Sequence, residues 1–150
     1  MVNEDYRDIL LALVKQHARF LVVGAHAMAA HGYPRATVDI DLWIEPSPEN
    51  AEHVWQALAE FGAPLEALNV TRDDFVRPDV VVQLGLPPNR VDILTGVSGL
   101  GFEQAWRNRI DAVVDGVHVP VLSMRDLIEN KRATGRDKDR VDIKGLKGET

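Results

Sequence analysis

Two carboxylates stand on one side of an otherwise apolar segment, the run Val-Asp-Ile-Asp-Leu-Trp-Ile at residues 38–44. Aspartate is a poor strand residue, so two of them in a strand-like segment indicate that the acidic face has a function. Because side chains alternate along a strand, Asp39 and Asp41 share one face and the aliphatic residues share the other. Two carboxylates held this close repel each other unless a proton or a divalent cation lies between them. The pair therefore predicts part of a metal site that needs a third ligand.

A third carboxylate, Asp92, stands in a similar segment, Arg-Val-Asp-Ile-Leu at residues 90–94. If the two strands are neighbours in one sheet, Asp92 joins Asp39 and Asp41 on the same face. Three carboxylates can hold two divalent cations about 4 Å apart, the arrangement used for in-line phosphoryl and nucleotidyl transfer. Mg²⁺ suits such oxygen ligands, with Mn²⁺ as an alternative. The competing interpretation is three solvent-facing aspartates on amphipathic strands.

The elements that must position these carboxylates are indicated by apolar periodicity and by cap and turn residues. Helices are expected at residues 4–18, 25–31, 50–61, 102–107, 123–134 and 137–146, with one helical turn at 71–75. Strands are expected at residues 20–23, 38–44, 80–84, 90–94, 110–114 and 117–122. The strands at 80–84 and 90–94 read as an antiparallel hairpin with a longer loop. The expected class is therefore α+β, with a mixed α/β arrangement of strands and helices.

Composition limits the classes of protein to consider. A chain of 150 residues with 45% hydrophobic residues suits one domain over residues 1–150, whose last helices span about 123–146. The net charge of −6 disfavours a broad nucleic-acid footprint, and the absence of cysteine excludes disulfides, thiolate metal sites and cysteine nucleophiles. The acidic, polar N-terminus is unlike a signal peptide, and the longest apolar run is too short for a bilayer. We expect a cytoplasmic protein with no membrane partner.

Gly24 follows the predicted strand at 20–23 and precedes a predicted helix. Glycine lets a backbone approach a phosphate closely, and a helix N-terminus offers free N–H groups. Many α/β turns contain one glycine, so the signal is weak alone. Its place just before the strand of Asp39 and Asp41 strengthens the prediction of a phosphate-binding turn.

The segment at residues 22–42, VVGAHAMAAHGYPRATVDIDL, resembles the signature of the nucleotidyltransferase superfamily. This fold is shared by DNA polymerase β, the antibiotic nucleotidyltransferases and the minimal nucleotidyltransferases. The segment is similar to that of a bacterial and archaeal group with the pattern Gly-Gly, then His-Gly-x-x-Arg-x-Thr-x-Asp-Ile-Asp, which is related to abortive-infection toxin nucleotidyltransferases. Asp92 stands where that group carries its third carboxylate. Residues 131–139 also resemble its C-terminal Lys…Gly-Arg-x-Lys-Asp segment, so the likeness covers nearly the whole chain.

The resemblance implies a nucleotidyltransferase-type mixed sheet flanked by helices, two Mg²⁺ ions and a nucleoside triphosphate such as ATP. It implies transfer of a nucleoside monophosphate to an acceptor hydroxyl, with release of pyrophosphate. Asp39 and Asp41 would hold both metals, while Asp92 would bind the catalytic metal and help to deprotonate the acceptor. Gly24 and the backbone after it would hold the β and γ phosphates. Ala25 stands where the family usually has Gly or Ser, so a phosphate-binding hydroxyl is missing although the backbone N–H remains.

Three other residues near the signature are candidate nucleotide contacts. His26 would lie in the first helical turn, near the phosphates. Arg35 could reach the triphosphate or the acceptor, and Thr37 could orient the first aspartate. A surface arginine and a turn-capping threonine are the alternatives. Trp43 shares the acidic face and could stack on a base, but a partly buried strand aromatic is the favoured interpretation.

Lys131, late in the predicted helix at 123–134, is a candidate phosphate contact. The basic residues around it could line the site or touch a polyanionic acceptor such as RNA, but intervening aspartates favour an ion-paired, solvated face. The cluster is Lys131, Arg132, Arg136, Lys138 and Arg140. The run Arg-Val-Asp-Ile at residues 140–143 resembles the Asp92 strand but lies in a lysine-rich, helical tail. We therefore interpret Asp142 as an ordinary surface or packing residue.

The acceptor, whether RNA, protein or a small molecule, and the preferred base stay open. A second hypothesis is a toxin that modifies tRNA or a protein and is paired with an antitoxin protein. A third is a non-catalytic nucleotide-binding module, made plausible by Ala25 and the short chain but opposed by the intact aspartate triad. Antibiotic modification usually recruits extra acceptor-binding structure, for which little chain is left.

Overall fold

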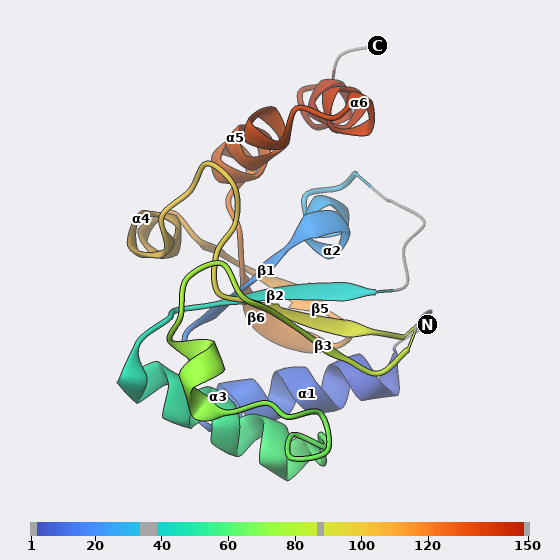
Figure 1. The fold of residues 1–150 in the computed structure, drawn as a ribbon. Helices are drawn as coiled ribbons and strands as arrows, with labels where there is room; N and C mark the ends of the chain where they lie inside the picture. The colour runs from blue at the N-terminus through green and yellow to red at the C-terminus, as the bar shows by residue number, and fades with distance from the viewer. Residues whose placement is uncertain (1–2, 34–38, 87–88, 149–150) are drawn as a thin grey trace.

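A computed structural model describes residues 3–33, 39–86 and 89–148, which form a mixed sheet with helices on both faces (Figure 1). The strands are β1 (Phe20–Val23), β2 (Ile40–Ile44), β3 (Val81–Leu84), β4 (Val91–Leu94), β5 (Ile110–Val114) and β6 (Val117–Val121). Their order across the sheet is β3-β4-β2-β1-β6-β5. β1 runs antiparallel to β2 and parallel to β6, and β2 runs parallel to β4. The β3–β4 and β5–β6 pairs are antiparallel, so the predicted α+β class is confirmed.

Helices cover both faces of this sheet. They are α1 (Glu4–Lys15), α2 (Gly24–Ala30), α3 (Pro48–Phe61), α4 (Phe102–Arg107), α5 (Met124–Thr134) and α6 (Asp137–Leu146), with a 3-10 turn η1 (Arg72–Phe75). In Figure 1, α1 and α3 lie below the sheet, and α2, α5 and α6 lie above it. Across the described ranges, no helix has the length and apolar character that a membrane crossing requires.

Local cap residues set several of the helix boundaries. The Ser47 hydroxyl accepts the Asn50 N–H at 3.2 Å where α3 begins, and the Ser123 hydroxyl accepts the Asp126 N–H at 3.1 Å where α5 begins. Gly135 ends α5 in the left-handed region, one residue after the predicted end of this helix at residue 134. These boundaries were readable from the sequence because they depend on neighbouring residues alone.

The predicted first helix, at residues 4–18, is too long. The structure ends α1 at Lys15, and His17 has a φ of +58°. A residue in the left-handed region cannot continue a right-handed helix, so the chain turns into β1 at this point. The other expected elements agree with the structure to within about two residues, and residue 38 of the second strand lies outside the described residues.

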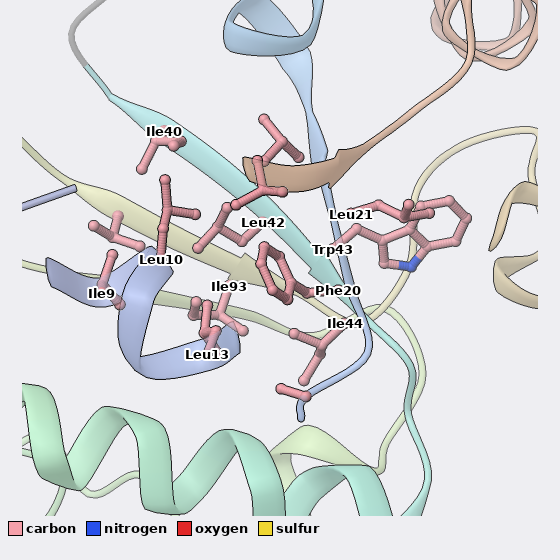
Figure 2. Packing of buried hydrophobic residues seen from close by; sticks show 14 of the residues in the cluster. Ile9, Leu10, Leu13, Phe20, Leu21, Ile40, Leu42, Trp43, Ile44 and Ile93 are labelled. Carbon is pink, nitrogen blue, oxygen red and sulfur yellow. The ribbon is translucent and has the colours of Figure 1, made fainter. Parts of the chain in front are cut away.

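The aliphatic face of the central strands forms the core beneath the sheet. The side chains shown in Figure 2 include Ile9, Leu10 and Leu13 of α1 and Ile40, Leu42, Ile44 and Ile93 of β2 and β4, all fully buried. Burying each of them contributes about 1.5–3 kcal/mol. A slip of β2 by one residue would put Asp41 into this core and is therefore excluded. The packing of the lower face thus fixes the upper face as the acidic one.

Candidate functional site

The register of the central strands brings the acidic residues together. In the parallel β2–β4 pair, Asp41 lies directly opposite Asp92, and in the β1–β2 pair it lies opposite Val23. Neighbouring strands are about 4.8 Å apart, so the two side chains on the same face meet. Asp39 immediately precedes β2. The two acidic strands are therefore neighbours, which is the condition under which Asp92 was expected to join Asp39 and Asp41.

Arg90, which the sequence analysis did not select, contacts two of the three carboxylates. Its Nε and Nη2 atoms donate to the two oxygens of Asp92 at 2.8 and 3.1 Å. Nη2 also lies 3.6 Å from Asp39 Oδ2, and the Arg90 backbone N–H donates to Asp39 Oδ1 at 3.0 Å. A signal was present, because Arg90 and Asp92 are two residues apart and so share one face of a strand.

Asp41 carries the strongest sign of crowded negative charge. Burial, and then the neighbouring carboxylate of Asp92, raises the pKa of Asp41 from 3.8 to about 6. Burial and the charge of Asp39 likewise raise the pKa of Tyr6 to about 12, and its hydroxyl donates to the Arg90 carbonyl oxygen at 3.3 Å. The site therefore holds more negative charge than its own cation neutralises.

Gly24 is required at its position for two reasons. Its φ is +68°, in the region that favours glycine, and a Cβ atom there would lie 2.5 Å from Asp41 Oδ2. The sequence analysis assigned this glycine to phosphate binding alone. The structure adds a second role, because the backbone turn leaves room for the Asp41 carboxylate.

The carboxylates line a cavity of about 370 Å³ that is closed on another side by α5 and α6. The volume lies within the usual range for small-molecule sites. Its ionic lining is Asp39, Asp41, Arg90, Asp92, Lys131, Arg136, Lys138 and Asp142, and its other lining residues are Val23, Gly24, Ala25, Met28, Leu94, Val97 and Asn130. A more open hollow of about 430 Å³ between α1 and α3 is lined by surface residues such as the Lys15–Glu60 ion pair. We place the candidate site in the first cavity because the three predicted carboxylates meet there.

Lys131 lies in the cavity wall but is already paired with two carboxylates. Its Nζ atom is 3.3 Å from Asp142 Oδ2 and 3.5 Å from Asp139 Oδ1, and both aspartates are fully buried. Burial would raise the pKa of Asp139, but hydrogen bonds from Arg136 and Thr134 and the charge of Lys131 outweigh it and hold that pKa well below its usual range. Lys131 thus joins α5 to α6.

Asp142 was predicted to be an ordinary surface or packing residue. The surface interpretation is wrong, because Asp142 is fully buried. Asp139 and Asp142 are three residues apart in α6, so both face α5. There the ammonium group of Lys131 pairs with both, and Arg136 also pairs with Asp139, which makes their burial tolerable. In the basic cluster, Arg132 and Arg140 form exposed ion pairs. This agrees with the interpretation of the cluster as an ion-paired, solvated face.

The remaining predicted residues have different positions. Ala25 lines the cavity, whereas the His26 ring packs edge-on against Tyr6, with ring centroids 5.6 Å apart. Burial lowers the pKa of His26, and this placement does not favour the predicted phosphate contact. Trp43 is buried against α4 and offers no exposed face to a base. Arg35 and Thr37 lie outside the described residues.

The donor set fits a hard divalent cation in its chemistry. Asp39, Asp41 and Asp92 supply only oxygen atoms, which are the ligands that hard divalent cations prefer. Asp41 and Asp92 lie directly opposite each other, so a cation between them would relieve their repulsion. Within residues 3–33, 39–86 and 89–148, no three acidic or imidazole side chains form a preformed metal cage. Arg90 holds Asp39 and Asp92 in the arrangement seen.

A protein-family profile described as "Nucleotidyltransferase of unknown function (DUF6036)" matches residues 2–147. The chain belongs to this nucleotidyltransferase family. The predicted family is therefore confirmed, and the family identity supports transferase activity. A search of curated proteins gives no match.

Solved structures share the fold of this nucleotidyltransferase at low sequence identity. TM1012 of Thermotoga maritima, described as a candidate nucleotidyltransferase, has a TM-score of 0.62 and 18% identity, over 99% of this chain and 96% of its own. The lincosamide antibiotic adenylyltransferase LnuA, solved with lincomycin, has a TM-score of 0.59 and 15% identity, over 100% and 99%. The antibiotic-resistance factor ANT(2'')-Ia has a TM-score of 0.56 and 13% identity, over 95% and 80%. These likenesses confirm the predicted mixed sheet flanked by helices.

Proposed function

We propose that this protein is a divalent-metal-dependent nucleotidyltransferase that moves a nucleoside monophosphate from a nucleoside triphosphate, such as ATP, to an acceptor hydroxyl. One observation carries the proposal. The strand register and the Asp39 contact with Arg90 gather Asp39, Asp41 and Asp92 at one wall of a cavity of about 370 Å³ that α5 and α6 line with cationic residues. An acidic wall can hold cations, and a basic wall can hold the phosphates that those cations bridge.

Each carboxylate has a proposed role. Asp39 and Asp41 would hold two Mg²⁺ ions, with Mn²⁺ as an alternative, and Asp92 would share one of them. These cations would supply charge neutralisation at the α-phosphate and the leaving pyrophosphate. The aliphatic partners of Asp41 in the core hold β2 rigidly, so the ligands are positioned before a substrate arrives.

The phosphate contacts are proposed at two places on the cavity wall. The backbone of Gly24 and Ala25 lies beside Asp41 and is the first. Arg136 and Lys138, at the start of α6, are exposed and are the second. Both are better candidates than Lys131, whose side chain is 9% exposed and paired with two buried aspartates. Arg136 also pairs with Asp139, but its side chain is 60% exposed, so water can solvate its charge when it leaves that partner.

The reaction follows from this arrangement. The oxygen of the acceptor hydroxyl attacks the α-phosphorus and forms a new phosphoester bond. The bond from that phosphorus to the bridging oxygen breaks, and pyrophosphate leaves with the electron pair. The acceptor proton passes to Asp92, which lies at the wall of the cavity.

A small hydroxyl-bearing molecule is the favoured acceptor. The net charge of −6 disfavours RNA, which needs a broad basic surface. The short chain was expected to leave little room for antibiotic modification, but LnuA has the same fold and is matched over 99% of its own length. A fold of this kind is therefore compatible with adenylyl transfer to a small acceptor. Nothing in the described residues favours an antitoxin partner.

Label transfer tests the proposal. Each of the four α-labelled triphosphates is incubated with the protein and with lincosamides and other hydroxyl-bearing antibiotics, tRNA or cell extract. We expect transfer with Mg²⁺ or Mn²⁺ and none with EDTA. Asp41→Asn should abolish transfer, whereas Asp111→Asn, on an exposed position of β5, should not. Full activity of Asp41→Asn would refute the metal role, and metal-dependent nucleotide binding without transfer to any acceptor would favour a non-catalytic module.

A further inference from the structure

Arg90 occupies both oxygens of a carboxylate that the proposed function assigns to a metal. Two parallel hydrogen bonds join its guanidinium group to Asp92, at 2.8 and 3.1 Å. This planar, bidentate geometry is the strongest form of an arginine–carboxylate pair. The same group lies 3.6 Å from Asp39, so one cation bridges two of the three candidate ligands.

The environment strengthens these contacts. The side chains of Arg90 and Asp39 are about one quarter exposed, and that of Asp92 is 11% exposed. Ion pairs at such partly buried positions are screened less by water and salt than surface pairs are. The Arg90 backbone N–H also donates to the other oxygen of Asp39. Arg90 therefore fixes the spacing between Asp39, which precedes β2, and Asp92 in β4.

A divalent cation and this guanidinium group compete for the same oxygens. A metal ion must approach a carboxylate oxygen to about 2.1 Å, and its double charge repels a guanidinium held against that carboxylate. Asp92 cannot keep both bonds to Arg90 and also serve a metal ion with the same lone pairs. The side chain of Arg90 lines the open cavity, so it has space to move when those bonds break.

We propose that Arg90 is a built-in competitor of the metal: it neutralises Asp39 and Asp92 in the metal-free protein and leaves Asp92 when a divalent cation binds. This inference rests on the proposed metal-dependent function. Arg90 acts through the carboxylates and is therefore a positioning residue. It sets the metal affinity below the value that the three carboxylates would give alone, and its release places a positive charge in the cavity where the triphosphate is proposed to lie.

Calorimetric titration with Mn²⁺ in the absence of nucleotide tests the proposal directly. Arg90→Gln removes the competing charge, so we expect the dissociation constant for Mn²⁺ to fall about tenfold. Arg90→Lys keeps a charge but loses the planar fork, so its affinity should lie between the two. Lys138→Gln is the matched control, since it removes one positive charge from the same cavity wall and should change the affinity less than about twofold.

A second measurement separates competition from a structural role. In EDTA, Arg90→Gln should have a lower thermal midpoint than the wild type, and saturating Mn²⁺ should raise the midpoint of the variant more than that of the wild type. A residue that only supports the fold would lower the midpoint without improving Mn²⁺ binding. If Arg90→Gln fails to fold, the Mn²⁺ titration and the thermal midpoint are measured on Arg90→Lys instead. We expect this variant to bind Mn²⁺ about threefold more tightly than the wild type.

The outcomes distinguish this inference from the proposed function. Mn²⁺ binding that is equal in the wild type and in Arg90→Gln, or weaker in the variant, would overturn the competition while leaving the metal site in place. An affinity gain in Lys138→Gln as large as that in Arg90→Gln would also overturn it, because the effect would then be general charge removal. Absence of Mn²⁺ binding in every protein tested would overturn both proposals.

Discussion

Asp41→Asn should stabilise the metal-free protein while abolishing its proposed activity. Asp41 is partly buried beside Asp92, and its burial together with that neighbouring carboxylate raises its pKa from 3.8 to about 6. A carboxylate whose pKa is raised by folding binds its proton more tightly in the folded state. Above pH 6 the folded protein must hold it ionised, which lowers the free energy of unfolding. The amide of asparagine is neutral, so the variant does not carry this free-energy cost of an ionised carboxylate.

The magnitude follows from the pKa. The difference between 3.8 and about 6 corresponds to about 3 kcal/mol of unfolding free energy. The stabilisation should be fully present above about pH 7. As the pH falls from about 6 to about 4, the wild-type carboxyl group takes up its proton and the difference between the two proteins should shrink towards zero. For a chain of this length, 3 kcal/mol corresponds to about 6–12 °C in thermal midpoint.

Urea unfolding in EDTA, at several pH values between 4.5 and 8, provides the measurement. The wild type and Asp41→Asn are compared with Asp111→Asn, which makes the same chemical change at an exposed position of β5. We expect a pH-dependent difference for the Asp41 variant alone. With saturating Mg²⁺ the order should reverse, because the wild type gains binding free energy that the variant has lost.

Two results would refute the reasoning. If Asp41→Asn is less stable than the wild type at pH 8 in EDTA, the carboxylate makes favourable contacts that outweigh its burial and its repulsion from Asp92. If the stability difference is the same at pH 5 and pH 8, then the proton on Asp41 is not its source. Either result would also weaken the argument that this acidic wall attracts a cation.

Lys131→Met and Gly24→Ala test the parts of the fold that shape the cavity, and Lys144→Met and Gly62→Ala are their controls outside it. Lys131→Met should lower the free energy of unfolding by about 3–5 kcal/mol in urea, because two buried aspartates lose a shared partner, whereas Lys144→Met on the exposed side of α6 should change it by less than about 0.5 kcal/mol. Gly62→Ala, at a φ of +94° with open space around it, should cost about 1–2 kcal/mol in the same assay. Gly24→Ala should cost about 1–3 kcal/mol more, since its methyl group would collide with Asp41, and equal losses would contradict that close approach.

Local signals explain why most of the fold could be predicted. The alternation around Asp41 identified the buried and the acidic face of β2, and Ser47, Ser123 and Gly135 marked helix ends through contacts within a few residues. The pairing of the two acidic strands was predicted only as a condition. The structure establishes this pairing, because the register places Asp41 of β2 opposite Asp92 of β4.

Contacts between distant segments could not be predicted in the same way. His26 was expected near the phosphates, but it packs against Tyr6, which belongs to a helix earlier in the chain. Asp142 was taken for an ordinary residue because its sequence neighbours are charged, yet the packing of α6 on α5 buries it against Lys131. A pattern in one segment shows which side chains share a face, but it does not show what covers that face.

The burial of the cavity's cations indicates which of them can serve a ligand. The Lys131 side chain is 9% exposed, and moving it would leave two fully buried carboxylates without their ammonium partner, at a cost of about 3–5 kcal/mol. Arg90 is 27% exposed and Arg136 is 60% exposed, so water can solvate their charges when they exchange partners. The ion pairs of Lys131 with Asp139 and Asp142 therefore hold α5 and α6 together whether or not a ligand is bound. The exchangeable cations are Arg90 beside the carboxylates and Arg136 and Lys138 at the start of α6. Arg136 can leave Asp139 for an incoming triphosphate because that aspartate keeps its contact with Lys131.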